Sequence, residues 1–372
     1  MAREGIVTLN RAMDLPGVPN SGALLETSTF PTSPPLPSSP PSRSVAPVPL
    51  TRYCAHVTKE ACRAARGTPV CGDVHFRKIH HPWTSHQAGD CHFLQLCRFS
   101  NSTCRYQHWE LDDTLAEQGK RPTAPPLRFC AEAAHKVPER LRAIPEPQWI
   151  CCDLRPKTFE SPFAFADQHP QTSTGFDLST LGQFGVICMD PPWAIGIDVP
   201  YDTLTDHDLR ELAIQALQDD GYLLLWVTGR AMESGRRLMT HWGYRRCSEI
   251  VWVKVNMMQN VIRTGRTGHF LNHTKEHCLV GVKGKPPRGV TGKPPDCDVI
   301  VSELRESSRK PDEIYGIANR LWPGARCLEL FARQHNVGKP GWVALGNQLE
   351  GSEIKDPRLL ERVRERYPHA GF

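Results

Sequence analysis

The sequence predicts an α/β protein in which an open sheet is covered by helices on both faces and is preceded by a metal-bound module. From Trp149 onward, short apolar runs alternate with helical patterns. These runs are continuously apolar rather than alternating, which is typical of strands that are buried on both faces. Residues 51–112 differ, because they hold six of the fourteen cysteines and seven of the sixteen histidines between short apolar runs.

Composition narrows the class of protein. The chain has 372 residues, enough for about two domains, and its net charge of +5 suits an anionic partner. No apolar run approaches the ~18 residues of a membrane helix, so no membrane association is expected. The N-terminus lacks the pattern of a secretory signal. We therefore expect a cytosolic or nuclear protein with reduced thiols, in which cysteines are metal ligands or buried groups.

The chain divides by composition. Eight prolines lie between Pro31 and Pro49, and a segment of this kind buries too little apolar surface to fold. We interpret it as a disordered tail, in preference to a proline-rich ligand of a small adaptor domain. The predicted divisions are a Pro/Ser-rich tail at 1–50, a tandem cysteine–histidine module at 51–112, a linker with some helix at 113–147, and an α/β domain at 148–368.

Seven strands are predicted from the apolar runs of the α/β domain. They are Phe184–Met189, Tyr222–Val227, Ile250–Val255, Cys278–Val282, Val299–Leu304, Cys327–Phe331 and Trp342–Leu345. Because strands and helices interleave, the sheet should be open, with its ligands beyond the carboxyl ends of the strands.

Three helices are expected between these strands. Thr205 and Asp208 form a capping-box pattern that starts a helix running to about Leu217. A second helix is predicted from Ala231 to Trp242, with Gly243 ending it. A third begins at Pro311 and places Ile314, Ile317 and Leu321 on one face.

The predicted strand that ends at Met189 runs directly into Asp190-Pro191-Pro192-Trp193. The prolines fix φ and remove donors, so the carbonyls of Asp190 and Pro191 and the carboxylate are candidate acceptors, and the indole is a candidate stacking surface. An aromatic amine suits such a site, because acceptors that hold its N–H groups orient the nitrogen toward an electrophile. The alternative is a tight turn that merely ends a strand.

Longer segments resemble one family throughout residues 51–368. They include Gln148-Trp-Ile-Cys-Cys-Asp153, Leu225-Trp-Val-Thr-Gly-Arg-Ala-Met-Glu233, Ile262-Arg-Thr-Gly-Arg-Thr-Gly-His269, Lys275-Glu-His-Cys-Leu-Val-Gly-Val-Lys-Gly284, Lys310-Pro-Asp-Glu-Ile-Tyr-Gly316 and Leu345-Gly-Asn-Gln-Leu349. Together with the Asp-Pro-Pro-Trp turn, these segments are similar to the catalytic subunits of eukaryotic mRNA N(6)-adenosine-methyltransferases. The resemblance implies a Rossmann-like S-adenosylmethionine methyltransferase domain with permuted motif order, in which the catalytic strand precedes the main cofactor strand.

The resemblance also implies roles for particular residues. Asp153 and Leu154 would contact the adenine side of the cofactor, and Lys310 would approach its carboxylate. Trp193 and Tyr201 would flank the target base beside Asp190, Pro191 and Pro192. The remaining implied cofactor residues are Asp190, Arg333, Gln334, His335, Asn336, Asn347 and Gln348, and those implied for RNA or a partner subunit, in and beside the loop Met257–Thr274, are Arg263, Arg266, His269, His273 and Lys275.

The sequence departs from the family pattern in places. Ala194 and Gly196 replace larger polar residues after the catalytic turn, and Arg309 stands where a histidine is expected. Ala332 and Gln334 replace glycine and proline, and an insertion of about twenty residues spans Pro156 to Asp177. These departures bear on the acceptor loop and the rate rather than on the reaction class. The family's leader with its adaptor-binding helix is absent or replaced by the tail, so recruitment by that adaptor is not expected.

The cysteine–histidine module contains two sets with the spacing of Cys3His zinc sites. They are Cys54-x7-Cys62-x8-Cys71-x3-His75 and Cys91-x5-Cys97-x6-Cys104-x3-His108, with His56, His80, His81, His86 and His92 as spare candidates. Four ligands leave no open position, so two structural zinc ions are predicted, in preference to buried free thiols. The aromatic residues Phe76, Phe93, Phe99, Tyr106 and Trp109 could stack on RNA bases or form small cores, and both uses are expected.

Residues 254–293 carry eight lysines and arginines against one acid, Glu276. Such a stretch could hold phosphates or be a solvated face, and the resemblance favours the first. The spacing of His269, His273 and His277 could place a metal site on a helix, but Gly265, Gly268 and the following strand argue against a helix.

The function predicted is methyl transfer from S-adenosylmethionine to the exocyclic amine of adenosine in single-stranded mRNA, giving N(6)-methyladenosine in the nucleus. The resemblance implies a heterodimer with a related non-catalytic subunit. Three alternatives stay open: a non-catalytic RNA-binding paralogue, a DNA adenine methyltransferase, and a zinc-finger RNA-binding protein whose enzyme domain has decayed.

Overall fold

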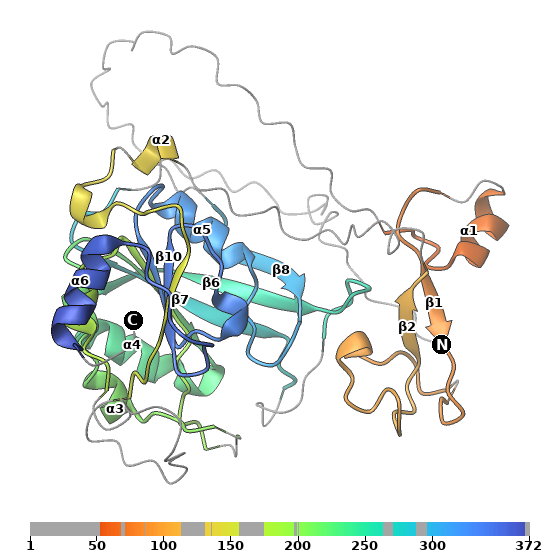
Figure 1. Ribbon diagram of the computed structural model, residues 1–372. Helices are drawn as coiled ribbons and strands as arrows, with labels where there is room; N and C mark the ends of the chain where they lie inside the picture. The colour runs from red at the N-terminus through yellow and green to blue at the C-terminus, as the bar shows by residue number, and fades with distance from the viewer. Residues whose placement is uncertain are drawn as a thin grey trace, which may run out of the picture. The chain divides into compact units, whose positions relative to one another are not determined.

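The protein folds around one large mixed α/β sheet in the computed structural model (Figure 1). The structure describes residues 53–67, 71–85, 87–112, 131–134, 136–155, 175–196, 199, 201–262, 271–287 and 296–368. The predicted tail and most of the insertion lie outside these residues. Among the described helices, none has the length and apolar character that crossing a membrane requires.

Eight strands form the large sheet in the order β3-β10-β9-β4-β5-β7-β6-β8. Neighbours pair in parallel except around β7, which is antiparallel to β5 and β6. The strands are β3 (Gln148–Cys151), β4 (Val186–Met189), β5 (Gly221–Val227), β6 (Arg245–Val255), β7 (Lys275–Lys283), β8 (Val299–Glu303), β9 (Cys327–Leu330) and β10 (Trp342–Gly346).

Strands β4, β5, β9 and β10 are buried on both faces, as their continuous apolar runs predicted, whereas β6 and β8 are partly exposed. One face packs on side chains from α3 (Asp206–Arg210), α4 (Met232–His241) and α6 (Pro357–Arg366). The other packs on α5 (Glu313–Leu321) and the single turn η3 (Glu139–Leu141). Successive residues of β4 and β5 alternate between the two cores, because side chains of a strand point to opposite faces.

All seven predicted strands are present. Strand β3, the outermost strand on one side of the sheet, was not predicted. The helix predicted from Thr205 to Leu217 is wrong in length. Its capping box is confirmed, with Thr205 and Asp208 bonded reciprocally, but α3 ends at Arg210 and only a 3₁₀ turn follows at Ile214–Leu217. The residues at 209, 212, 214 and 217 are all buried, and a spacing of two between Leu212 and Ile214 does not fit one face of an α-helix.

The other two helices follow their prediction closely. Helix α4 ends before Gly243, whose φ of 83° only glycine adopts readily. Helix α5 buries Ile314 and Ile317, while Leu321 is partly exposed. Helix α6 was not predicted, although Asp356 before Pro357 is a standard start signal.

The cysteine–histidine module is small and has little regular structure. Helix α1 (Lys59–Arg66) is capped by Thr58, and strands β1 (Phe76–Ile79) and β2 (His108–Leu111) pair antiparallel. The module also contains the 3₁₀ turn η2 (Leu94–Leu96). The short helix α2 (Ala131–Ala134) lies in the predicted linker.

Candidate active site and metal centres

The order of the strands brings together, at the carboxyl ends of the strands, residues that are far apart in the sequence. Strands β3, β10, β9 and β4 are adjacent and parallel, so their carboxyl ends meet at the same edge. The residues that follow these strands are Asp153 and Leu154, Asn347 and Gln348, Arg333 to Asn336, and Asp190 with its turn. Predicted cofactor residues separated by almost two hundred positions thus come together where α/β sheets bind ligands.

Glycine at the end of β10 is required by close backbone approach. A Cβ at Gly346 would lie 2.1 Å from the carbonyl oxygen of Ala332. Without a side chain, the segment after β10 meets the segment after β9, and Arg333 forms an isolated bridge with Gln348. This contact places the exposed amides of Asn347 and Gln348 beside Arg333.

The Asp-Pro-Pro-Trp turn is anchored more tightly than expected. The Trp193 indole is only 8% exposed, and its Nε1–H donates to the Trp226 carbonyl at 3.0 Å. The Pro191 carbonyl accepts from the Trp193 N–H at 2.9 Å, and the Pro192 carbonyl accepts from Leu204 at 2.8 Å. Both residues thus hold the turn in shape, and the Pro191 carbonyl keeps one lone pair for a further donor.

Asp190 belongs to a network of four charged side chains. The Lys310 Nζ donates to Asp190 Oδ2 at 2.6 Å and lies 3.3 Å from Glu276 Oε2. The other Glu276 oxygen accepts from Lys254 at 2.5 Å. Two carboxylates and two ammonium groups alternate, so each charge has an opposite neighbour although all four are largely shielded from water.

The network sets the protonation of its members. Burial raises the pKa of Asp190, and Lys310 opposes this rise. Burial would also raise the pKa of Glu276, but Lys310 and Lys254 together hold it at about 2. The carboxylates of Asp190 and Glu276 keep Lys310 charged by raising its pKa. The ammonium of Lys310 therefore stays a donor, and with two of its three hydrogens used it retains one for a third acceptor.

Glu276 and Lys254 were not assigned a role from the sequence. The signal was present, because Glu276 is the lone acid in a strongly basic stretch. It lies at the start of β7, whose antiparallel direction brings that end to the edge where β4 and β6 finish. The antiparallel strand thus delivers the counter-ion that the two lysines need.

Replacing Glu276 by Gln is expected to destabilise the protein by about 3 kcal/mol at neutral pH, because Lys254 and Lys310 lose their shared counter-ion. Since the pKa of Glu276 is lowered by folding, its contribution is present above its unfolded value near 4.5 and is lost as pH falls toward 2. Urea unfolding between pH 7 and pH 3 measures this. Equal stabilities of wild type and variant at pH 7 would contradict the network, and Glu233→Gln, an exposed acid on α4, serves as the control.

Arg155 connects two parts of the proposed cofactor side. Its guanidinium donates to both carboxylate oxygens of Asp153, with Nε 2.9 Å from Oδ1 and 2.7 Å from Oδ2, and also pairs with Asp202. The Arg333 guanidinium lies 5.5 Å from the ring centroid of Tyr201. Tyr201 and Asp202, which follow the Asp-Pro-Pro-Trp turn, are thus held against residues from the ends of β3 and β9.

The remaining predicted cofactor residues differ in accessibility. The Asn336 amide donates to Tyr315 at 2.7 Å and to Glu329 at 3.1 Å, and accepts from the Arg333 N–H at 2.7 Å. These bonds make it a brace for the segment after β9. Burial, with Arg309 nearby, lowers the pKa of His335 to about 4, so this imidazole is neutral. Gln334 is exposed, whereas Leu154 is 5% exposed.

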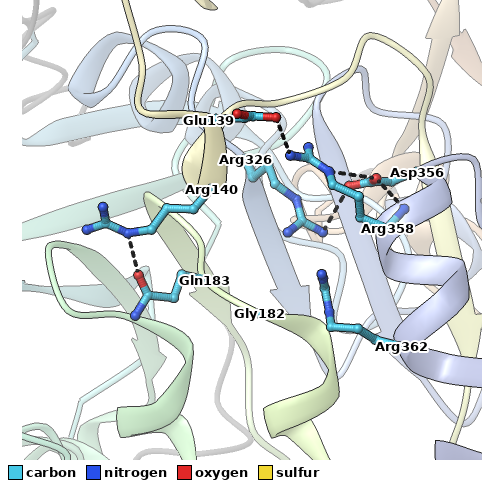
Figure 2. A pocket seen from close by; sticks show the side chains of 8 residues that line it. All are labelled: Glu139, Arg140, Gly182, Gln183, Arg326, Asp356, Arg358 and Arg362. Atoms are coloured by element: carbon cyan, nitrogen blue, oxygen red, sulfur yellow. Dashed lines mark hydrogen bonds and ion pairs between the residues drawn. The ribbon is translucent and has the colours of Figure 1, made fainter. Parts of the chain in front are cut away.

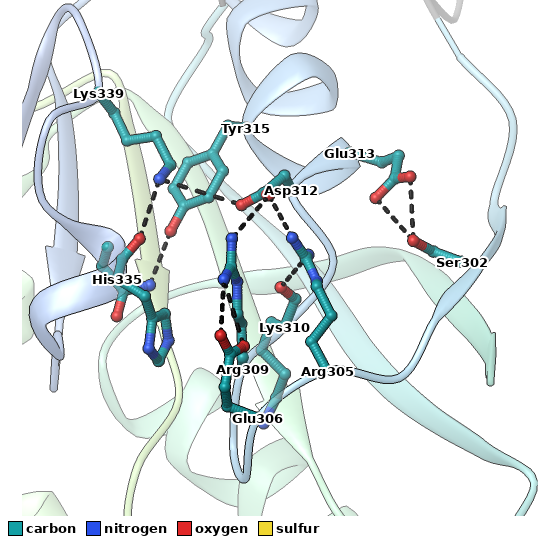
Figure 3. Close-up of polar contacts among 11 residues, drawn as sticks. Ser302, Arg305, Glu306, Arg309, Lys310, Asp312, Glu313, Tyr315, His335 and Lys339 are labelled. Carbon is teal, nitrogen blue, oxygen red and sulfur yellow. Dashed lines mark hydrogen bonds and ion pairs between the residues drawn. The ribbon is translucent and has the colours of Figure 1, made fainter. Parts of the chain in front are cut away.

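The residue that replaces an expected histidine, Arg309, lies in an ion-pair cluster before α5 (Figure 3). It contacts Glu306 at 3.2 Å and Asp312 at 3.3 Å, and Arg305 also pairs with Asp312. Arg305 further donates to the Lys310 carbonyl at 3.1 Å. The cluster fixes the backbone of the segment that presents Lys310 to Asp190.

Part of the basic loop lies outside the described residues, including Arg263, Arg266 and His269. Lys275 and His273 are described, and the Lys275 side chain contacts His277. His277 is in β7 and pairs with Glu249. The rejection of a helical three-histidine metal site is confirmed for His277, which is in a strand.

The two predicted metal centres each assemble as four side chains. In both sets, Cys54 with Cys62, Cys71 and His75, and Cys91 with Cys97, Cys104 and His108, the ligand atoms all lie within 4.8 Å of one another. The Sγ atoms of Cys62 and Cys71 are 3.7 Å apart, and those of Cys91 and Cys104 are 4.0 Å apart. Two sulfurs bound tetrahedrally to one zinc lie about 3.8 Å apart.

The His108 ring provides a second test of the fit. It is 1% exposed, and neither ring nitrogen has a hydrogen-bond partner among the described residues. A buried imidazole without partners is costly, and a metal ion in the group formed with Cys91, Cys97 and Cys104 would use one of these nitrogens. The donor set therefore fits zinc.

The aromatic residues of the module separate into two kinds. Phe76 and Trp109 are buried, at 3% and 8% exposure, and form a small core with Leu94. Phe93, Phe99 and Tyr106 are exposed, at 36%, 56% and 48%. The expectation of a small core is confirmed for Phe76 and Trp109, and the three exposed aromatics all lie between ligands of the second set.

An α/β domain with an acidic Asp-Pro-Pro-Trp turn at the carboxyl edge of its sheet has the form of an amino-methyltransferase. Residues 184–348 match the MT-A70 family. The turn, the network around Asp190 and the residues at the carboxyl ends of the strands all fall within the match, apart from Asp153 and its neighbours.

Curated relatives extend the likeness beyond this domain. The chain is 46% identical over 322 residues to the human N(6)-adenosine-methyltransferase catalytic subunit METTL3, covering 86% of this chain and 52% of that protein. It is 47% identical over 327 residues to a probable N(6)-adenosine-methyltransferase MT-A70-like protein of Oryza sativa subsp. japonica, covering 86% and 42%. The chain thus spans about half the length of the curated relatives it matches.

Similarity to a non-catalytic subunit is weaker. The Drosophila melanogaster N(6)-adenosine-methyltransferase non-catalytic subunit METTL14 is 30% identical over 209 residues, 48% of this chain and 50% of that protein. The chain therefore resembles proteins named as catalytic more strongly than this non-catalytic one.

Proposed function

We propose that the protein transfers a methyl group from S-adenosylmethionine to the exocyclic amine of adenosine in mRNA, within a Rossmann-like domain. The observation that carries this proposal is the Asp190 carboxylate, held at the carboxyl end of β4 by Lys310 in a domain that matches the MT-A70 family. The 46% identity to proteins named N(6)-adenosine-methyltransferase catalytic subunit supports the substrate.

The residues at the carboxyl edge suit the cofactor chemically. S-adenosylmethionine, when bound, supplies an electrophilic methyl group on a sulfonium sulfur. The exposed amides of Asn347 and Gln348 and the Arg333 guanidinium would bind ribose hydroxyls, and the remaining Lys310 hydrogen would bind a carboxylate. Asp153 and the backbone at Leu154 would meet the adenine, although Asp153 would have to share its carboxylate with Arg155.

Asp190 would orient the amine and then receive its proton. Lys310 occupies Oδ2, which leaves Oδ1 to accept an N–H of the adenine. The amine becomes acidic only after it is methylated, so a strong base is not required beforehand. Because burial raises the pKa of Asp190, its carboxylate is a better proton acceptor at that moment than an exposed aspartate.

The cysteine–histidine module would be a pair of zinc fingers that captures single-stranded RNA. Exposed Phe93, Phe99 and Tyr106 offer stacking surfaces, and the Lys78 Nζ lies 5.3 Å from the centroid of the Trp109 ring. The basic loop that contains Arg263 and Arg266 would hold phosphates or a related non-catalytic subunit, by analogy with the subunits named in its relatives. We also propose that the protein acts in the nucleus.

Phe99→Ala is expected to weaken binding of a single-stranded oligoribonucleotide by about 1–3 kcal/mol, the range for one stacked base. Fluorescence anisotropy with the full chain measures the change, and zinc content should stay constant because Phe99 is exposed. Phe99→Leu is the matched control, since it keeps an apolar side chain but removes the ring. An unchanged affinity for Phe99→Ala would argue against stacking there.

A DNA adenine methyltransferase of the same class remains the second candidate, because Asp190 would contact only the exocyclic amine, which adenine carries in both RNA and DNA. Paired Cys3His groups with exposed aromatics favour unpaired RNA over duplex DNA. Transfer to matched DNA at the rate for RNA would support the second candidate.

A further inference from the structure

A cavity lies at the amino ends of the strands, opposite the carboxyl ends where Asp190 lies. Its volume is about 530 Å³, and it opens beside the residues that precede β4 and β9. Gln183 stands just before β4, Arg326 immediately before β9, and Arg358 and Arg362 extend from α6 (Figure 2). Because these are the amino ends of parallel strands, the cavity is separate from the proposed methyl-transfer site.

The cavity is strongly basic. It is lined by four arginines against two carboxylates, which leaves a net charge of +2: Arg140, Arg326, Arg358 and Arg362 against Glu139 and Asp356. Figure 2 shows Arg140 on one side of it and the other three arginines gathered on the other side. Guanidinium groups repel one another most strongly where water is excluded, as at the buried Arg326, so additional negative charge would stabilise this arrangement.

Arg326 shows that the compensation is incomplete. It is only 5% exposed, its Nη1 donates to the Leu181 carbonyl at 3.4 Å, and its Nη2 donates no hydrogen bond to any described residue. Its ion-pair partner, the Oδ2 of Asp356, is 3.9 Å from Nη2, and the other oxygen of the same carboxylate pairs with Arg358. Burial lowers the pKa of Arg326 to about 10, and Arg362 and Arg358 push it the same way.

Asp356 cannot move closer to complete the pairing. Its Oδ1 caps α6 by accepting the Arg358 N–H at 3.0 Å, and its own N–H donates to Gln148 at 2.8 Å. Arg362 is likewise fixed, with Nε and Nη2 donating to the Thr180 and Leu181 carbonyls at 2.8 and 3.0 Å. These hydrogen bonds hold Asp356 and Arg362 in place, and no described residue supplies the acceptor that the Arg326 Nη2 lacks.

We propose that this cavity binds a phosphate group. A phosphate monoester or inorganic phosphate carries close to two negative charges at neutral pH, which matches the net charge of the lining. Its oxygens suit the forked N–H groups of arginine. A single carboxylate would leave half of the charge unmatched. The charge could come from a free phosphorylated small molecule or from two adjacent, singly charged phosphodiesters of an RNA strand, and arginine recognises the oxygens of both in the same way.

The test is a titration of the full-length protein with inorganic phosphate at constant ionic strength, followed by thermal unfolding. Phosphate salts stabilise proteins in general, so the specific part is the difference between wild type and Arg358→Gln. Arg358 and Arg140 are partly exposed, at 46% and 56%, so their glutamine variants should fold. Arg364→Gln, on the same helix but outside the cavity lining, is the control.

Wild type and Arg364→Gln should show a saturable rise in Tm whose midpoint shifts by about tenfold or more in Arg358→Gln and Arg140→Gln. A parallel titration with a uridine-only oligoribonucleotide, which offers phosphates but no adenosine, decides the source. An affinity for this RNA that depends on Arg358 assigns the site to RNA, and a response to inorganic phosphate alone assigns it to a small molecule. Identical curves for wild type and both cavity variants, with both probes, would overturn the proposal.

Discussion

Asp190→Asn is expected to reduce methyl transfer by at least about 10²–10³-fold, the usual effect of removing one preorganised group that stabilises a transition state. The amide keeps the shape of the side chain but loses the charge and the ability to receive the proton. It also offers an N–H where an acceptor is required. A single-turnover assay with labelled S-adenosylmethionine and a single-stranded RNA measures the loss.

The variant should keep its fold, because Lys310 retains Glu276 as a counter-ion at 3.3 Å. Circular dichroism and the unfolding temperature check this directly. Asp206→Asn is the matched control: this aspartate is on α3, is 47% exposed and pairs with Arg237, so its loss should cost little. Full activity in Asp190→Asn would remove Asp190 from the mechanism.

Cys91→Ser is expected to lower the zinc content of the purified protein from two ions to one. A structural zinc site contributes on the order of 10 kcal/mol to folding of a small module, and a hydroxyl is a poor zinc ligand. RNA capture should therefore weaken far more than cofactor affinity. Elemental analysis measures the zinc, and anisotropy and calorimetry measure the two affinities.

Cys297→Ser provides the comparison, since Cys297 is exposed and belongs to neither ligand group. It should leave zinc content and RNA affinity unchanged. If Cys91→Ser bound RNA as tightly as wild type, the module would have no role in capture, whatever its metal content.

Much of the α/β domain could be predicted from the sequence because its central strands are buried on both faces. Continuous apolar runs located seven of the eight strands, and Gly243 marked the end of α4. Strand β3 was missed because it has only four residues, of which two are partly exposed. The capping box predicted where α3 begins but not where it ends. Leu212 and Ile214 are both buried, and this spacing of two does not fit one face of an α-helix.

The sequence predicted which residues lie at the carboxyl ends of the strands better than it predicted the contacts that they make. Strand-end positions favoured Arg333 and Asn336 as ligand groups, and the family resemblance added Asn347. Lys310 contacts both Asp190 and Glu276, and Glu276 lies at the start of the antiparallel strand β7. These contacts depend on how the strands are arranged, so no local segment of the sequence could predict them. The burial of the Trp193 indole likewise follows from how the turn packs on β5.

The most direct test of the central claim is a methyl-transfer assay with labelled S-adenosylmethionine. Matched adenosine-containing single-stranded RNA and DNA would be compared, each with and without a related non-catalytic subunit. We expect label on the exocyclic amine of adenosine in RNA, with much more transfer when the second subunit is present. Absence of transfer under every condition, together with absence of cofactor binding, would contradict it and leave a zinc-dependent RNA-binding protein.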